Sequence, residues 1–440
     1  MLRMNPFPPD LLRSLARTHG TPLWAYDAAT IRQRIASLKS FDVIRYAQKA
    51  NSNVHLLRLM REQGVRVDAV SLGEIERAWV AGYRVESSQA VTAIVFTADL
   101  FDRATLERVV VDRIPVNAGS IDMLRQLGAR TSKDLSSDPS INPSAHTSGH
   151  RSGHPVWLRI NPGFGHGHSN KTNTGGEHSK HGIWHGDLAE ALAVIRSQGL
   201  HLVGLHMHIG SGVDYAHLGQ VCGAMVDLVA QVDLPIEAIS AGGGLSIPYR
   251  EGDAAIDPEH YFGLWDAARR RIEALRGHAV QLEIEPGRYL VAEAGVLVSE
   301  VRAVKHQGTK RFVLVDAGFN DLMRPSMYGS HHGIVLLPGA SDISQETRTD
   351  VTMPTVVAGP LCESGDVFTQ GEGGVVLTRE LPAARVGDLL VFEDAGAYGA
   401  SMSSNYNSRP LIPEVLVDAG QPRLIRRRQT VAELLALEAV

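Results

Sequence analysis

Lys49 directly follows a stretch that alternates like a strand (FDVIRYA, 41–47), in a chain that uses lysine sparingly. Only 7 of its 43 basic residues are lysines. Arginine supplies positive charge equally well, but only a lysine amine can lose its proton and form a Schiff base with a carbonyl. Lys49 is therefore a candidate nucleophile, and a solvated surface charge is the simpler alternative.

Glycine-rich turns follow two later apolar stretches. The first is IGSG, which contains Ser211, and the second is AGGG, which contains Gly242, Gly243 and Gly244. Backbone amides in such turns can bind a phosphate, because glycine lets the backbone come close to a ligand. A plain tight turn is the alternative interpretation of either motif.

An acidic motif follows another apolar stretch: EPGR, which is Glu285, Pro286, Gly287 and Arg288. A lysine, a phosphate-binding turn and an acid together suggest pyridoxal phosphate, which needs an anchoring amine, phosphate ligands and a partner for its pyridine nitrogen. An acidic partner keeps that nitrogen protonated, so Glu285 is the candidate. A salt bridge between Glu285 and Arg288 is the alternative.

The motif HMH carries two histidines, His206 and His208, at a spacing that faces one side of a strand. Such a pair suits zinc, and further histidines occur at 166, 168, 178, 181 and 185. No cysteine or carboxylate cluster completes a tetrahedral set, so we predict no metal site. A flat imidazole stacking on a cofactor ring explains one of the pair better.

Three segments in the second half of the chain are rich in polar groups. Cys362 lies in GPLCESGDVF (359–368) with Glu363 beside it, surroundings that suit a reactive thiol better than those of Cys222 on an apolar helical face. The other two segments combine arginine with tyrosine: FNDLMRPSMYGS holds Arg324 and Tyr328, and DAGAYGASMSSNYNSRP holds Tyr398 and Arg409. That combination suggests carboxylate recognition.

Eight short apolar stretches, separated by amphipathic segments, must position these residues. They are 41–47, 65–70, 93–98, 114–119, 156–162, 202–210, 236–244 and 280–287. This repetition predicts a (β/α)8 barrel, in which chemistry lies at the carboxyl ends of the strands. After about residue 290, strands without regular helices predict a separate β-sandwich or barrel-like domain, with a last helix near TVAELLALEAV. The serine-rich segment 131–153 is predicted to be a flexible surface insertion.

Composition excludes several classes of protein. The 440 residues carry a net charge of −5 with a pI near 6.4, which argues against nucleic-acid or anionic-membrane partners. Two cysteines far apart in sequence do not form a disulfide framework. Prolines interrupt the start where a signal peptide needs an apolar run, and no stretch reaches the length of a membrane span. We expect a cytoplasmic protein.

The chain resembles the fold-type III pyridoxal-phosphate decarboxylases, whose fold is alanine-racemase-like. Six of its motifs occur in the order seen in that family: YAQKAN, HMHIGSG, GGG, EPGR, GPLCESGD and DAGAYG. The resemblance covers nearly the whole chain. It implies a barrel over 27–290 that binds pyridoxal phosphate. It also implies a β domain from 1–26 with 291–440, which completes the active site across a homodimer.

The resemblance also implies residue roles. Lys49 carries the cofactor, His208 stacks on its ring and Glu285 pairs with its nitrogen. Ser211, Gly242 to Gly244 and Arg288 lie around the phosphate and its approach. Pro286 and Gly287, which precede Arg288 in the EPGR motif, also bind the cofactor. The amino-acid substrate is bound by Arg288, Arg324, Tyr328, Glu363 and Tyr398, of which Tyr398 also contacts the cofactor. Cys362 is the proton donor and reaches, with Glu363, into the partner subunit.

The distal end of the substrate decides between members of this family. Glu363 suits a distal ammonium, while Arg324 with Tyr328 suits a distal carboxylate. Decarboxylases of arginine, ornithine or carboxynorspermidine are the nearest alternatives, and Arg324 argues against them because a distal cation does not favour an arginine. A non-catalytic homologue is expected to lack Lys49 or Cys362, and an amino-acid racemase does not explain CESGD.

Overall fold

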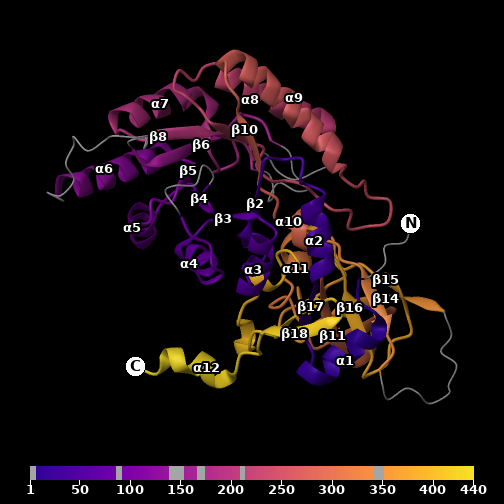
Figure 1. The fold of residues 1–440 in the computed structure, drawn as a ribbon. Helices are drawn as coiled ribbons and strands as arrows, with labels where there is room; N and C mark the ends of the chain where they lie inside the picture. The colour runs from indigo at the N-terminus through magenta and orange to yellow at the C-terminus, as the bar shows by residue number, and fades with distance from the viewer. Residues whose placement is uncertain (1–5, 86–91, 138–152, 166–173, 209–213, 340–350) are drawn as a thin grey trace. The chain divides into compact units, whose positions relative to one another are not determined.

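The computed structural model describes residues 6–85, 92–137, 153–165, 174–208, 214–339 and 351–440 (Figure 1). The chain forms two compact units. One contains 35–246 with 256–287, and the other contains 1–34, 247–255 and 288–440. We call them the barrel unit and the β unit.

The barrel unit is a closed parallel barrel. Its strands, in sequence order, are β2 (Val43–Ala47), β3 (Arg66–Ala69), β4 (Ile94–Ala98), β5 (Val116–Ala118), β6 (Pro155–Asn161), β8 (His201–His206), β9 (Ala238–Ser240) and β10 (Gln281–Ile284). Pairing of β5 with β6 and of β10 with β2 closes the ring, and the short β7 (Ile183–Trp184) adds to β6. All eight strands predicted from the sequence are confirmed.

Helices connect successive strands and cover the outside of the barrel (Figure 1). They are α3 (Val54–Glu62), α4 (Leu72–Val80), α5 (Arg103–Val111), α6 (Ile121–Ser137), α7 (Leu188–Ser197), α8 (Tyr215–Val229) and α9 (Pro258–Arg276). Several begin at a side chain that accepts a backbone N–H of the first turn, among them Asn53, Ser71 and Asp257. Such caps fix where each strand-to-helix loop ends.

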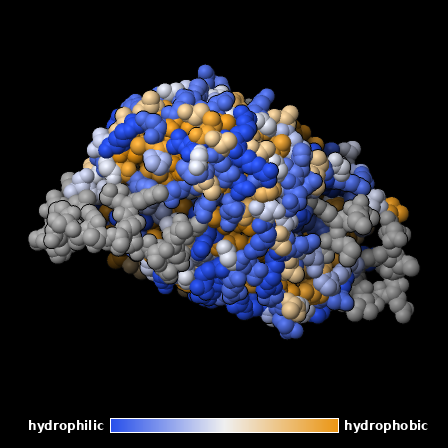
Figure 2. Space-filling view, turned by 45° about the horizontal axis from the view of Figure 1, so that its top comes forward, coloured by the Kyte–Doolittle hydropathy of each residue, from blue (hydrophilic) through white to orange (hydrophobic). Residues whose placement is uncertain are grey.

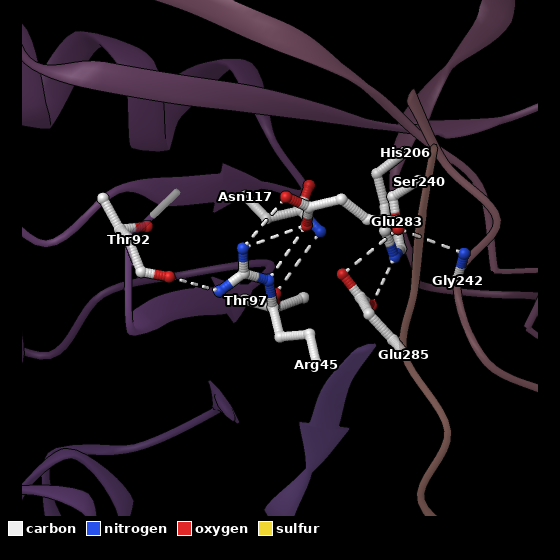
Figure 3. A network of polar contacts seen from close by, with 9 residues as sticks. All are labelled: Arg45, Thr92, Thr97, Asn117, His206, Ser240, Gly242, Glu283 and Glu285. Atoms are coloured by element: carbon white, nitrogen blue, oxygen red, sulfur yellow. Dashed lines mark hydrogen bonds and ion pairs between the residues drawn. The ribbon is translucent and has the colours of Figure 1, made fainter. Parts of the chain in front are cut away.

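The barrel interior contains an ion pair within its apolar core (Figure 3). The Arg45 guanidinium donates to both Glu283 oxygens at 3.0 and 3.1 Å, and its Nη1 donates to the carbonyl of Thr92. Arg45 and Glu283 are 1% and 3% exposed. Because a buried charge is tolerated only when it is paired, each of these two residues requires the other.

The β unit is built on one mixed sheet with the N-terminal strand inside it. The path runs β15 (Arg379–Pro382), β14 (Thr352–Ala358), β12 (Lys310–Val315), β11 (Gly295–Gln307), β1 (Leu23–Asp27), β17 (Glu414–Asp418) and β18 (Gln421–Arg426), and β16 (Leu389–Phe392) pairs with β11 and β13 (Ile334–Leu337). β1 pairs with β11 and with β17, so the N-terminal strand joins the C-terminal domain as the resemblance implies.

Short helices complete the β unit. They are α1 (Pro9–His19), α2 (Ala28–Ala36, which crosses the boundary between the units), α10 (Arg288–Val291), α11 (Arg324–Tyr328) and α12 (Val431–Leu435). Leu12 and Leu15 lie on one face of α1 and pack into a core with Leu23, Val298 and Val391. The face of the molecule seen in Figure 2 is mostly hydrophilic, with apolar residues in patches among the charged ones.

Two predicted ranges differ from the structure. Helix α6 continues to Ser137, so the serine-rich segment does not begin as an insertion at 131, and residues 138–152 lie outside the described residues. Thr131 and Ser132 donate their hydroxyls to the carbonyls of Leu127 and Gly128 in the preceding turn, so a hydroxyl-rich stretch is compatible with the helix here. Residues 27–34, 247–255 and 288–290 belong to the β unit, although they lie inside the predicted barrel range 27–290.

Arg45→Met tests the interior ion pair. We expect a loss of about 3–5 kcal/mol in the free energy of unfolding, because Glu283 is left as an uncompensated buried charge. Adding Glu283→Leu to the same chain should recover most of the loss. The control is Arg125→Met, which removes an exposed arginine paired with Asp122 and Glu190 and should leave the denaturation midpoint unchanged. Equal midpoints for Arg45→Met and the wild type in urea would contradict this role.

Candidate active site

Polar residues from several strands meet at the carboxyl-terminal rim of the barrel unit. Lys49 lies in a single 3₁₀ turn, Gln48–Ala50, directly after β2. Asp68 lies near the end of β3, His208 follows β8 and Glu285 follows β10. Because all barrel strands are parallel, their carboxyl ends share one rim. The expected convergence of Lys49, His208 and Glu285 on this rim is confirmed, and Asp68 lies there with them.

Glu285 is held by a buried hydrogen-bond network (Figure 3). His206 Nε2 donates to one carboxylate oxygen at 2.7 Å, and Ser240 Oγ donates to the other at 3.3 Å. The amide of Gly242 donates to Ser240 Oγ at 3.2 Å, and the amide of Glu285 donates to the Gly242 carbonyl at 2.7 Å. The buried carboxylate is thus paired with His206.

The pKa values of the two buried carboxyl groups of the rim, Glu285 and Asp68, are shifted in opposite directions. Burial raises the pKa of Glu285, but the charge and hydrogen bond of His206, with the charge of Arg45, outweigh it and hold that pKa below its ordinary value. Burial and then the charge of Glu285 raise the pKa of Asp68 to about 8, against the pull of Lys49. At neutral pH, Glu285 is therefore ionised and Asp68 is protonated. Such a divergence of two neighbouring acids is typical of catalytic sites.

His208 is held as a neutral ring. Its Nδ1 accepts the amide N–H of Gly243 at 2.8 Å, so a neutral ring carries its proton on Nε2. Burial, followed by the positive charge of Lys49, holds the pKa of His208 well below its ordinary value. A flat, uncharged imidazole is suited to stacking on an aromatic ring.

Gly242 and Gly243 allow three strand ends to approach one another. A Cβ at Gly242 would lie 2.2 Å from the Met207 carbonyl oxygen, and one at Gly243 would lie 2.4 Å from the Glu285 carbonyl oxygen. Gly242 and Gly244 also have positive φ angles of 60° and 96°. These glycines are therefore required to bring His208 and Glu285 together, and binding of a phosphate by their amides stays a prediction.

Lys49 lies among ionisable groups of the same rim. It is exposed, and its positive charge acts on the pKa values of Asp68, Glu74 and His208. The residues at this rim fit pyridoxal phosphate. An accessible amine, an ionised carboxylate, a neutral flat ring and a glycine turn without room for side chains are the four features that this cofactor needs.

A second cluster lies in the β unit and is rich in positive charge. The guanidinium carbons of Arg288 and Arg324 lie 5.6 and 4.8 Å from the centre of the Tyr249 ring, and that of Arg288 lies 5.2 Å from the Tyr398 ring. Among the residues that the structure describes, neither guanidinium forms an ion pair with a carboxylate. Two charged guanidiniums without an anionic partner suit the binding of a carboxylate.

The loop that carries Cys362 is anchored at its base and exposed at its tip. Asp366 accepts the amide N–H groups of Leu361 and Phe319, each at 2.7 Å. Cys362 and Glu363 are exposed, and the Cys362 amide donates to the Asn407 side chain at 2.9 Å. The Glu363 carboxylate accepts the hydroxyl of Tyr406. The loop thus presents a thiol and a carboxylate on a fixed base.

The remaining predicted residues are divided between the two units. Tyr328 ends α11, four residues after Arg324, and Pro286 and Gly287 form the turn after β10. Ser211 lies outside the described residues, as do the histidines at 166 and 168. In the described part of the chain, no three His, Cys, Asp or Glu side chains are grouped so that they could hold a metal ion.

The chain matches known proteins over nearly its whole length. Residues 28–292 match the family model described as "Pyridoxal-dependent decarboxylase, pyridoxal binding domain". Diaminopimelate decarboxylase of Escherichia coli K12 is 63% identical over 98% of this chain and 96% of that protein. The chain belongs to the diaminopimelate decarboxylase family of pyridoxal-dependent decarboxylases.

Solved structures of the family have the same fold. A crystal structure of diaminopimelate decarboxylase aligns with a TM-score of 0.89 at 62% identity, covering 98% of this chain and 96% of that one. The Helicobacter pylori enzyme complexed with L-lysine aligns with a TM-score of 0.80 at 30% identity, covering 97% of this chain and 98% of that one. The protein is therefore a pyridoxal-phosphate enzyme with the fold-type III architecture expected from its motifs.

Three residues of these sites escaped the sequence analysis. His206 was seen only as half of a possible zinc pair, although its two-residue spacing from His208 already placed both on one side of the strand. Tyr249 stands five residues after the glycine triad, and His332 follows Tyr328 by four. The sequence gives no signal for the contacts of Tyr249 and His332, because they join segments far apart in the chain.

His206→Leu tests the control of Glu285. Removing the hydrogen bond and charge that lower its pKa should let Glu285 take up a proton at higher pH. The apparent pKa of the acidic limb, in a plot of kcat/KM against pH, should then rise by about 1 unit.

The matched control is His201→Leu. His201 is on the same strand and its Nε2 lies 2.6 Å from a Glu237 oxygen, but it is at the opposite end of β8 from the rim. Its pH profile should match that of the wild type. If the two variants gave the same acidic limb, His206 would have no special influence on Glu285.

Proposed function

We propose that the protein removes one carboxyl group from meso-2,6-diaminopimelate to give L-lysine and carbon dioxide, the last step of lysine biosynthesis. The observation that carries this proposal is the identity of 63% over 98% of the chain with a diaminopimelate decarboxylase. The guanidiniums of Arg288 and Arg324, which both contact the Tyr249 ring, support it. This substrate has a carboxylate at its distal end as well as at the reacting one. A cytoplasmic setting belongs to the same proposal. In the described part of the chain, no helix has both the length and the apolar character to cross a bilayer.

The barrel unit supplies the residues that would hold the cofactor. Lys49 would bind it through its amine, His208 would cover its ring and the Gly242–Gly244 turn would take its phosphate. When bound, pyridoxal phosphate supplies an electron sink for the charge left on carbon when carbon dioxide departs. Glu285, kept ionised by His206, would pair with the pyridine nitrogen and favour its protonated form, which makes the ring an effective sink.

The β unit supplies the residues for substrate. Arg324 and Tyr328 take the distal carboxylate, Glu363 takes the distal ammonium, and Arg288 and Tyr398 complete the set. Cys362 delivers a proton to the carbon that has lost its carboxylate, or positions a water that does so. A site equipped for both distal groups rejects substrates that lack one, because buried charges are then left without partners.

The substrate preference is tested by carbon dioxide release. Purified protein with added pyridoxal phosphate should act on meso-diaminopimelate, with kcat/KM for L-lysine, L-ornithine and L-arginine at least about 100-fold lower. Lys49→Ala should abolish release. Lys39→Ala changes an exposed lysine that donates to the Gln63 carbonyl and should retain full activity. Preference for ornithine or arginine would contradict the assignment of Arg324 and Glu363.

We also propose a homodimer in which the Cys362 loop of one subunit completes the site of the other. The exposed thiol and carboxylate at the tip of an anchored loop support this arrangement. Lys49→Ala and Cys362→Ala subunits, each inactive alone, should regain about a quarter of wild-type activity when refolded together, since half of the dimers are mixed and each has one intact site. No recovery in dimers shown to be mixed would mean that each site is built from one chain.

A further inference from the structure

Tyr249 lies between the two arginines of the β unit. Its hydroxyl accepts from Arg288 Nη1 at 2.7 Å, and its ring faces the guanidinium of Arg324 at 4.8 Å. The His332 ring meets it edge-on, with the ring centres 5.6 Å apart and the planes at 78°. One aromatic ring thereby contacts both guanidiniums and the histidine.

His332 has a defined tautomer. Its Nδ1 lies 2.9 Å from the carbonyl oxygen of Glu393, which can only accept, so Nδ1 carries the proton. Its Nε2 lies 3.0 Å from Arg324 Nη1, which can only donate, so Nε2 offers a lone pair. Burial and the charge of Arg324 hold the pKa of His332 well below its ordinary value, so the ring stays neutral.

The partners of the two arginines are therefore uncharged. A carboxylate in place of His332 would orient Arg324 equally well, but it would neutralise the charge that the substrate needs. A neutral acceptor and an aromatic face fix a flexible guanidinium while its charge and remaining N–H groups stay free for a ligand. Fixing it before binding also reduces the entropy lost when the ligand arrives.

We propose that Tyr249 and His332 are positioning residues, which hold Arg288 and Arg324 in place for the distal carboxylate of the substrate without neutralising them. This proposal rests on the proposed function, because it assigns the cluster to a substrate with a carboxylate at each end. It concerns affinity for the carboxylate and not the bond-breaking step.

The test uses three ligands, of which L-lysine and cadaverine differ only in the distal carboxylate. Meso-diaminopimelate has the distal carboxylate, and L-lysine keeps it, because decarboxylation removes the carboxyl group from the other end. Cadaverine, 1,5-diaminopentane, lacks it. KM and kcat for meso-diaminopimelate and inhibition constants for L-lysine and cadaverine are measured on His332→Leu, His332→Gln, His332→Glu and Tyr249→Phe, after thermal unfolding and cofactor absorbance show that each variant is folded and loaded.

We expect His332→Leu to raise KM and the L-lysine inhibition constant together by about 10- to 100-fold, since a buried N–H of a charged group loses its acceptor. The cadaverine constant and kcat should change less than about threefold, because neither depends on the distal carboxylate. His332→Gln keeps a neutral acceptor and should restore most of the loss. His332→Glu should be at least as impaired as His332→Leu, because it neutralises Arg324.

Tyr249→Phe removes only the hydroxyl and leaves the ring. It should raise the same two constants by a smaller factor, about 5- to 10-fold, through Arg288. The matched control is His331→Leu, which changes the neighbouring histidine. Its Nδ1 has no hydrogen-bond partner among the described residues, and its KM should equal that of the wild type.

Equal rises for L-lysine and cadaverine, or unchanged KM values in both His332→Leu and Tyr249→Phe, would overturn the proposal. Superior activity of His332→Glu over His332→Leu would overturn the argument from charge. Failure of the proposed function is a separate result. In that case the wild type acts on another amino acid, and the comparison of L-lysine with cadaverine still shows whether the cluster binds a carboxylate.

Discussion

The hydrogen bond between His206 and Glu285 is the interaction on which the barrel rim depends. Glu285 is 6% exposed, so an isolated carboxylate there would be protonated. His206 donates to it at 2.7 Å and keeps it charged. The same residue, Glu285, binds the Gly242 carbonyl through its amide, which ties the ends of β9 and β10 together. One buried acid thus controls both the electrostatics of the rim and its local geometry.

The two sites differ in how their buried charges are partnered. At the barrel rim and in the barrel interior, Glu285 is paired with His206 and Arg45 with Glu283. In the β unit, Arg288 and Arg324 contact tyrosine rings and a neutral histidine, and in the described residues neither is paired with an acid. The first arrangement gives a fixed environment for a cofactor ring. The second leaves positive charge available, which is the property that a carboxylate-binding site requires.

Local pattern was enough to predict much of the fold and part of the site. In the sequence, each barrel strand is a short run of residues that are continuously or alternately apolar. A helical pattern follows each run, so the number and order of the strands can be predicted from the sequence. The rim position of Lys49, Asp68, His208 and Glu285 follows too, since parallel strands place their carboxyl ends together. The pattern failed at residue 131, where serine content suggested an insertion but α6 continues to Ser137. Serine content alone therefore does not determine where a helix ends.

The sequence by itself determined the barrel, the strand-rich second unit and the residue types that the chemistry needs, because these depend on periodicity and on neighbours a few residues apart. Only the tertiary structure decided which groups are partners. Glu285 pairs with His206, which lies 79 positions away in the sequence. Tyr249 joins the β unit from a segment between two barrel elements, and His332 receives its tautomer from the Glu393 carbonyl, 61 positions away. Such choices depend on distances and burial in the folded chain, which no local pattern encodes.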